Sequence, residues 1–143
     1  MYHYTECGLQ NVHLENGYRI HKTPHGTGVA IQDVAGLHAL IGRSIARRPR
    51  LSGAELRFLR KEMELSQGAL ANLLGTSEQN VSLWERRGKI PKWSARLVKL
   101  LYMERLDGNV QILKMIEQLN EQDSGGEEEL RFKERAGRWK TAA

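Results

Sequence analysis

The sequence predicts a mainly α-helical protein in which a compact helical bundle is preceded by a small antiparallel β-hairpin or sheet and one helix. Two observations predict this class. Within residues 51–106, apolar residues recur at helical spacing in short segments bounded by capping residues or glycines. Before residue 33, apolar and polar residues alternate, as they do in half-buried strands. We expect four regions: residues 1–50, 51–106, 107–122 and 123–143.

Composition limits the class of protein. Of 143 residues, 40% are hydrophobic and 27% are charged, which is typical of a folded soluble protein. No apolar run is long enough to cross a membrane, and the N-terminus lacks the basic start and apolar stretch of a secretory signal. Cys7 is the single cysteine, so no intrachain disulfide forms. We expect a cytoplasmic protein with no membrane partner.

The net charge of +5 is concentrated in the first two regions. Residues 1–50 carry six Lys or Arg against three acids, and residues 51–107 carry ten against seven. Residues 108–143 carry six against seven. Because neutralising phosphates releases condensed counterions, a basic front suits a phosphate-facing surface.

In residues 1–50, two turns and one helix are predicted. Asn16-Gly17 separates two alternating runs, and such a pair favours a tight hairpin turn. A second turn is expected at residues 25–28, giving a sheet of two or three strands. Because a two-stranded sheet is marginal in water, we expect the helix of residues 34–47 to cover one face. Its apolar stripe is Leu37, Leu40, Ile41 and Ile45.

Four short helices are predicted in residues 51–106. Ser52 with Glu55 forms a capping box for the first helix. Ser66 and Ser77 cap the second and third helices, which end at glycines, and Pro91 opens the fourth. Their apolar stripes are Leu56, Leu59, Met63, then Leu70, Ala71, Leu73, Leu74, and finally Ala95, Val98, Leu101, Tyr102.

The rest of the chain is predicted to hold one amphipathic helix and a flexible tail. Val110, Leu113, Ile116 and Leu119 repeat at spacings of three, which indicates the helix. We expect this stripe to serve packing or a dimer interface. After Asp123 the residues are mostly polar, with glycine pairs, so we expect little fixed structure there.

Residues 67–86 match the requirements of a helix-turn-helix. Ala71 is small where two crossing helices must approach, and Gly75 accepts the positive φ of a tight turn. No proline interrupts the segment. The apolar residues that would hold the second helix are Leu70, Leu74, Val81 and Trp84.

The segment LSGAELRFLRKEMELSQGALANLLGTSEQNVSLWERRGKIP resembles the Xre, or lambda-repressor-like, helix-turn-helix family. The resemblance covers about residues 53–105. It implies a compact helical domain that binds double-stranded DNA, usually as a dimer, with its third helix in the major groove. The family skeleton appears as Ser66-Gln67, Leu70-Ala71, Leu74-Gly75, Ser77, Gln79, Val81-Ser82, Trp84-Glu85 and Gly88.

The resemblance implies that base contacts come from the start of the third helix. Ser77 begins it, and Gln79 is the first candidate because an amide can form two hydrogen bonds with adenine. Asn80 is the second candidate, with a phosphate as its other partner. Glu78 either accepts a hydrogen bond from cytosine or favours the helix N-terminus through the dipole.

The roles of other residues in the motif are predicted less specifically. Ser82 and Leu83 lie one turn further along, and Leu83 suits a thymine methyl, although many relatives have a polar or basic residue there. Gln67 resembles the family's phosphate-contacting glutamine, with a capping role as the alternative. Trp84 is expected in the core. Glu85 is expected to pair with Arg57 or Arg60.

Two basic groups flank the motif. The first is expected to touch phosphate, with a solvated surface as the alternative: Arg86, Arg87, Lys89 and Lys92. The second is either an arm in the minor groove or the solvated side of a linker: Arg43, Arg47, Arg48 and Arg50.

No pattern predicts catalysis, a metal or a cofactor. With a single cysteine the sequence has no CxxC pair, so no zinc site is predicted among Cys7 and the five histidines. Cys7 has no basic neighbour to lower the pKa of its thiol, and no nucleophile-elbow or phosphate-loop sequence occurs. We therefore predict a protein that is not an enzyme.

The predicted function is sequence-specific repression, autoregulatory, at a palindromic operator bound by a homodimer. Xre domains joined to a small extra domain are common among antitoxins of the HigA and MqsA kinds, which repress their own toxin operon. The order found here, a front unit followed by a C-terminal Xre domain, resembles MqsA-type antitoxins. MqsA-type antitoxins hold zinc through cysteine pairs, so a single cysteine implies a zinc-free relative whose residues 1–47 dimerise or bind a cognate toxin. The alternative is a protein–protein interaction module with the helical domain as scaffold and a tail, including Phe132 and Trp139, that folds on a partner.

Overall fold

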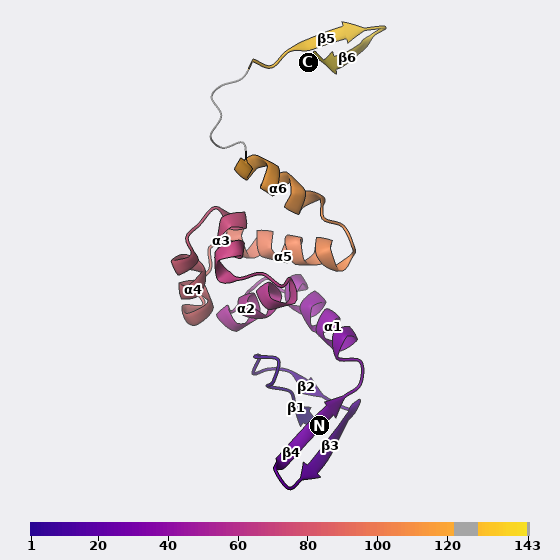
Figure 1. The fold of residues 1–143 in the computed structure, drawn as a ribbon, viewed down its shortest axis with the longest axis vertical. Helices are drawn as coiled ribbons and strands as arrows, with labels where there is room; N and C mark the ends of the chain where they lie inside the picture. The colour runs from indigo at the N-terminus through magenta and orange to yellow at the C-terminus, as the bar shows by residue number, and fades with distance from the viewer. Residues whose placement is uncertain (122–128, 143) are drawn as a thin grey trace.

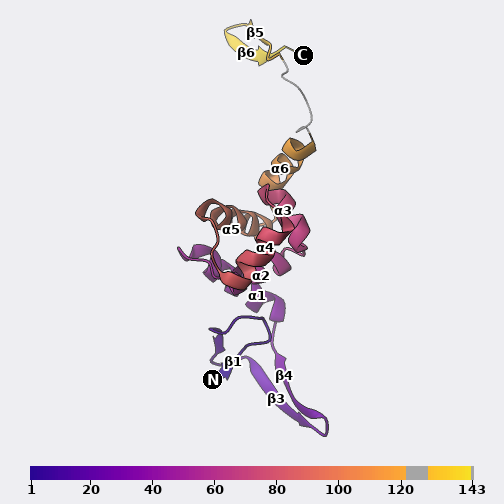
Figure 2. The same ribbon diagram turned by 90° about the vertical axis from the view of Figure 1, so that its left-hand side faces the viewer.

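The computed structural model describes residues 1–121 and 129–142, which are mainly helical with three small antiparallel sheets (Figure 1). Figure 2 shows the β3–β4 hairpin at one end of the long axis, the helices between, and the β5–β6 hairpin at the other end. The helices are α1 (Val34–Arg47), α2 (Gly53–Glu62), α3 (Gln67–Leu74), α4 (Glu78–Arg87), α5 (Lys92–Leu106) and α6 (Gln111–Glu121). The strands are β1 (Tyr2–His3), β2 (His13–Leu14), β3 (Tyr18–Thr23), β4 (Gly26–Ile31), β5 (Phe132–Arg135) and β6 (Arg138–Thr141).

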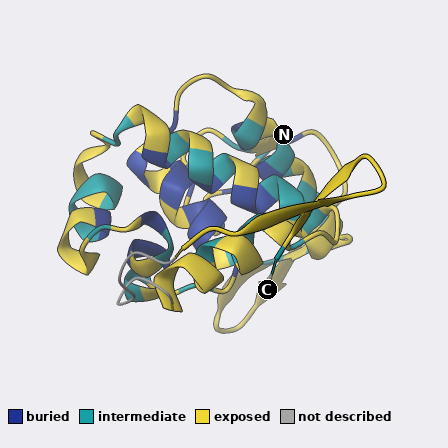
Figure 3. Cartoon of the chain, turned by 90° about the horizontal axis from the view of Figure 1, so that it is seen from above, coloured by how far each residue is buried: buried dark blue, intermediate teal, exposed yellow. Residues whose placement is uncertain are grey.

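The core lies among the helices. The buried residues, dark blue in Figure 3, gather in the bundle, whereas the hairpins are almost wholly exposed. Apolar side chains that are essentially inaccessible come from α2, α3, α4 and α5: Leu56, Leu59, Leu70, Val81 and Val98. The apolar stripes predicted for residues 51–106 supply this core. Within the described part of the chain, none of the helices has the length and hydropathy that a membrane crossing requires.

The predicted helix boundaries in the bundle are confirmed. Ser52 and Glu55 form a reciprocal capping box at the start of α2. The hydroxyl of Ser66 accepts a hydrogen bond from the backbone of Ala69, which satisfies one of the unpaired amides at the start of α3. Pro91 precedes the first residue of α5. Local capping chemistry therefore defines where these helices begin.

The pairing predicted for the front strands is wrong. β2 pairs with β1, and β3 pairs with β4, so two separate two-stranded sheets form instead of one sheet. Gly17 has a positive φ of 80°, but the Asn16-Gly17 turn leads from one sheet to the next. β3 aligns all six of its residues with β4, whereas β2 offers only two. The turn predicted at residues 25–28 lies at Pro24 and His25.

The helix of residues 34–47 forms as predicted, but it does not cover the β3–β4 sheet. α1 packs against α5 and α2. Gly42 lies so close to Tyr102 of α5 that a Cβ atom there would be 1.9 Å from the tyrosine oxygen. Ile45 is buried in the bundle core, while Leu40 of the expected stripe is 63% exposed. The bundle offers α1 more apolar surface than a hairpin with mostly exposed residues can.

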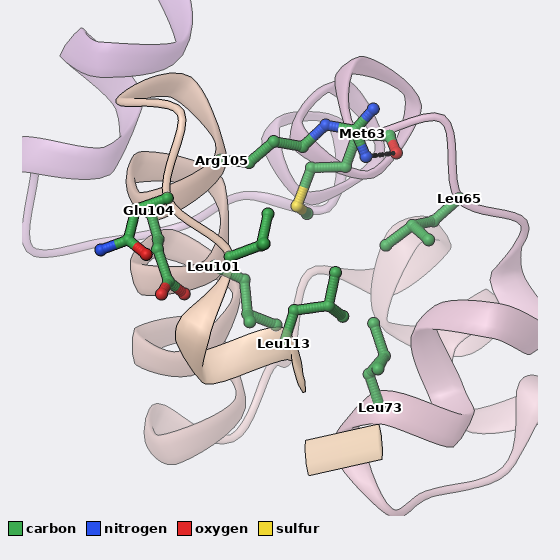
Figure 4. A pocket seen from close by; sticks show the side chains of 9 residues that line it. Met63, Leu65, Leu73, Leu101, Glu104, Arg105 and Leu113 are labelled. Atoms are coloured by element: carbon green, nitrogen blue, oxygen red, sulfur yellow. Dashed lines mark hydrogen bonds between the residues drawn. The ribbon is translucent and has the colours of Figure 1, made fainter. Parts of the chain in front are cut away.

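α6 closes one side of the bundle, as an amphipathic helix should. Its residues Ile112, Leu113 and Ile116 pack against the core. In Figure 4, Leu113 lies with Leu101 of α5 at an apolar hollow that Leu65 and Leu73 also line. Beside it, Arg105 Nη1 donates to the Met63 carbonyl over 2.6 Å, which links α5 to the end of α2.

Part of the predicted flexible tail is ordered. Residues 122–128 lie outside the described residues, but β5 and β6 form an antiparallel hairpin. Ala136 and Gly137 both have positive φ, 54° and 77°, which is the two-residue type I′ geometry that suits the twist of a hairpin. The turn was not predicted from the sequence, because Asn, Asp or Gly is expected at the position that alanine occupies here.

Candidate nucleic-acid interface

α3 and α4 form a pair of short helices joined by a tight turn. Gly75 has a φ of 68°, and the backbone N–H of Thr76 donates to the Ala71 carbonyl over 2.9 Å. Together with the Gly75 bond to Asn72, this is a Schellman ending of α3. The small Ala71 and the apolar Val81 are buried where the two helices meet. The small residue, the positive-φ glycine and the buried valine expected in residues 67–86 are therefore present, and Trp84 is half-buried against the core.

A buried ion pair holds α4 on α2. Arg60 donates from Nε to Glu85 Oε2 over 2.7 Å and from Nη2 to Oε1 over 3.0 Å, a two-point contact. The side chains of Arg60 and Glu85 are only 10% and 5% exposed. Of the two partners predicted for Glu85, Arg60 is the one used. A third guanidinium nitrogen donates to the Leu65 carbonyl over 2.9 Å, so the α2–α3 connection is tied to the same pair.

Gly53 fixes how closely α4 approaches α2, and the sequence analysis missed it. A Cβ atom at this position would lie 2.2 Å from the Glu85 carbonyl oxygen and 2.8 Å from that of Trp84. These are backbone atoms, so no side-chain rotation relieves the clash. Gly53 is the first residue of α2, where no sequence rule distinguishes a packing glycine from an ordinary one.

One face of α4 is free and polar. Glu78 and Gln79 are exposed, and Ser82 and Leu83 are half-buried. Together with Gln67 and Arg86, these four residues line a single shallow hollow of the surface. Six of the residues expected to contact DNA are thus neighbours on one face.

Three of the predicted residues have hydrogen-bond partners within the helix pair or the buried ion pair. Ser77 caps α4 by accepting from the backbone N–H of Asn80 over 3.1 Å. The Asn80 amide donates to the Thr76 hydroxyl over 2.9 Å, a contact that the sequence analysis did not anticipate. Gln67 Nε2 donates to Glu85 Oε1 over 3.2 Å, so the Gln67 amide is tied to the buried ion pair. These contacts hold the Asn80 amide against Thr76 and the Gln67 amide against Glu85.

Among the described residues, some of the predicted basic side chains form ion pairs and others form none. Arg86 and Arg87 lie in the last turn of α4, where they complement the helix dipole, and Lys89 is exposed just beyond Gly88. In the second group, Arg43 binds Asp107 over 3.1 Å and Arg48 forms an ion pair with Glu55. These two pairs favour a structural role for Arg43 and Arg48 over a minor-groove arm.

A second hollow, which is basic, lies beyond the end of α4. Gly88 and Ile90 line it together with four cations: Arg50, Lys92, Arg96 and Lys99. Burial, and next the charge of Arg48, lower the pKa of Lys99, whose ammonium donates to the backbone carbonyls of Arg48 and Arg50. Arg96 and Lys99 were missed by sequence, although their spacing from Lys92 places all three on one helix face.

Three of the five histidines, His3, His13 and His38, make side-chain contacts within the fold. His38 Nε2 and the Tyr4 hydroxyl lie 2.8 Å apart, and His38 Nδ1 lies 3.4 Å from Glu62, which joins the N-terminal segment to α1 and α2. The rings of His3 and His13 stack with centroids 4.5 Å apart. Across residues 1–121 and 129–142, no three His, Cys, Asp or Glu side chains are grouped closely enough to hold a metal ion.

In comparisons with known proteins, no family model, curated protein or solved structure matches this chain. What the site can do therefore rests on its own residues.

Proposed function

We propose that this protein binds double-stranded DNA through α3 and α4 and represses transcription from its own promoter. In this proposal the helices form a lambda-repressor-like arrangement of the Xre kind, with α4 in the major groove. The observation that carries it is the free face of α4, where Glu78, Gln79 and Ser82 are accessible. The opposite face is locked by buried Val81 and the Arg60–Glu85 pair.

Each residue of the face has a role in this proposal. Gln79 reads adenine with its amide, and Glu78 accepts from cytosine. Leu83 contacts a thymine methyl. Arg86 and Lys89, beyond the reading residues, bind phosphates and set the register of α4 on the duplex.

The protein acts as a homodimer in this proposal, because one module buries little surface on DNA. Two copies of α4 then meet half-sites about one helical turn apart in a palindromic operator. Within residues 1–50, the β3–β4 hairpin binds a cognate toxin in this proposal, as in an antitoxin, since the hairpin is exposed and lies away from α3 and α4 (Figure 1). Failure to co-purify with the product of any adjacent gene would remove the toxin from the proposal and leave the repressor.

The test is a fluorescence-anisotropy titration of the upstream promoter DNA of its own gene, with a random duplex of equal length as reference. Gln79→Ala is expected to weaken promoter binding by about 1–3 kcal/mol, or about 5- to 150-fold. Binding of the random duplex should change little, because phosphate contacts remain. Gln118→Ala is the matched control, since Gln118 is an exposed glutamine on α6, outside the proposed reading surface.

Loss of promoter preference in Gln79→Ala but not in Gln118→Ala supports α4 as the reader. Equal affinity of the wild-type protein for promoter and random duplex would refute sequence-specific repression at this promoter. Equal effects of the two variants would refute the role of Gln79.

A further inference from the structure

The β5–β6 hairpin separates its charges by face. In its register, Lys133 lies opposite Lys140 and Arg135 lies opposite Arg138. Residues directly opposite each other, and residues two apart on one strand, point to the same side of an antiparallel pair. One face therefore carries only cations: Lys133, Arg135, Arg138 and Lys140. The other carries Phe132, Glu134, Trp139 and Thr141.

This arrangement is unfavourable for the hairpin alone. Like charges directly opposite each other destabilise an antiparallel pair. The four cations fall within a patch of about 7 by 5 Å from strand geometry, shorter than the screening length of about 8 Å at physiological salt. All eight strand residues are exposed.

Nearby acids of the described chain do not neutralise the face. Glu134 points to the other side and accepts from the backbone N–H of Gly137 over 2.9 Å. Glu129 pairs with Arg131, which precedes the strand, over 3.2 Å. None of the four cations forms an ion pair with any residue in the parts of the chain that the structure describes.

We propose that the basic face of the β5–β6 hairpin is a second DNA-binding surface, which contacts phosphates of the duplex alongside the α3–α4 site. A two-stranded β-ribbon has the dimensions to enter the major groove, and its cations match the regular negative charge of the backbone. The inference rests on the proposed function, because the α3–α4 site brings the hairpin to a duplex. Binding through α3 and α4 makes the hairpin contact intramolecular, so even weak phosphate contacts add affinity.

The contact is independent of sequence, because it involves phosphates and no base edges. Each phosphate contact contributes about 0.9 to the slope of log affinity against log salt. Replacing two cations of the face should therefore reduce the magnitude of that slope by about 2.

The experiment measures anisotropy titrations of the full chain on a random duplex and on the promoter duplex, each at several salt concentrations. The variant is Arg135→Gln with Arg138→Gln, which removes one cross-strand pair. The matched control is Arg19→Gln with Lys22→Gln in the β3–β4 hairpin, which lowers the net charge equally but removes cations whose register places them on opposite faces. Cross-strand NMR contacts between Glu134 and Trp139 verify that the variant hairpin still forms.

We expect the slope to fall by about 2 on both duplexes for the β5–β6 variant, from the two lost phosphate contacts, and to stay unchanged for the control. Equal slopes for variant and control would overturn the inference. So would a variant that binds DNA normally but no longer binds anionic phospholipid vesicles, because the face would then serve a membrane. The proposed function would fail on a different result, which is equal affinity of the wild-type protein for the promoter and the random duplex. The β5–β6 variant does not change that comparison.

Discussion

The helical bundle and the two long hairpins of this protein are stabilised in different ways. The bundle buries apolar side chains from α2 to α5 and encloses an arginine–glutamate pair. The β3–β4 and β5–β6 hairpins bury almost nothing and depend on their turns and backbone ladders. The difference teaches that one chain combines a rigid platform for α4 with peripheral ribbons whose surfaces are free for partners.

The contrast also concerns charge. In the bundle, the most buried charges are paired: Glu85 with Arg60, and Glu55 with Arg48. On β5 and β6, like charges face each other without such pairing in the described residues. A buried charge without a partner costs several kcal/mol of free energy, whereas water solvates an unpaired charge on an exposed ribbon, where it can bind an anion.

The largest expected effect comes from breaking the buried pair of the bundle. Glu85→Ala leaves the guanidinium of Arg60 buried without its carboxylate, which should lower the free energy of unfolding by about 3–5 kcal/mol. Urea denaturation followed by circular dichroism measures it. The control is Glu64→Ala, which removes an 84% exposed carboxylate that lies 3.5 Å from Arg105. A surface pair of this kind is worth at most about 1 kcal/mol, so comparable losses in both variants would contradict the comparison.

The next effect comes from the close approach of α2 and α4. Gly53→Ala places a methyl group against the carbonyls of Glu85 and Trp84, and such overpacking costs about 1–3 kcal/mol. Because α4 must shift, promoter affinity should fall together with the thermal midpoint. Gly68→Ala on α3 is the control, since its Cβ would meet nothing nearer than 3.5 Å, and a helical alanine should not destabilise. A Gly53→Ala protein as stable as wild type would show that α4 is not held against α2 as described.

A smaller effect is expected at the turn between α3 and α4. Gly75→Ala forces a side chain into the left-handed region at φ 68°, at a cost of about 1–2 kcal/mol. Gly75→Asn should recover part of this loss, because asparagine tolerates that region better. Chemical denaturation of the two variants compares them directly. Equal stabilities of the alanine and asparagine variants would indicate that backbone conformation is not the cause.

The smallest effect is expected from the ribbon. A chain that ends at residue 130 lacks β5 and β6. Its free energy of unfolding should lie within about 0.5 kcal/mol of that of the full chain, because the hairpin adds little to the core. A chain that ends at residue 109 also lacks α6, whose Ile112, Leu113 and Ile116 pack on the core. The free energy of unfolding of this shorter chain should be lower than that of the full chain by about 2 kcal/mol or more. Similar losses for both truncations would show that the ribbon is part of the folded bundle.

Much of the bundle and of the candidate site followed from local chemistry in the sequence. Ser52, Ser66 and Ser77 mark helix starts because their hydroxyls satisfy amides only a few residues away. Gly75 and Gly88 mark helix ends because they accept positive φ. The apolar stripes follow from the helical period, so the side of α4 that is buried was predictable, and with it the side that is free.

Which distant segments of the chain meet depends on tertiary packing. Strand pairing in residues 1–31 is decided by which neighbours offer a matching ladder, and α1 rests on α5 because the bundle offers more apolar surface than the hairpin. Arg60, and not Arg57, reaches Glu85, and Gly53 has no space for a side chain; both depend on how two helices lie across each other. Sequence periodicity describes one element at a time, so contacts between elements, which arise from packing, are beyond its reach.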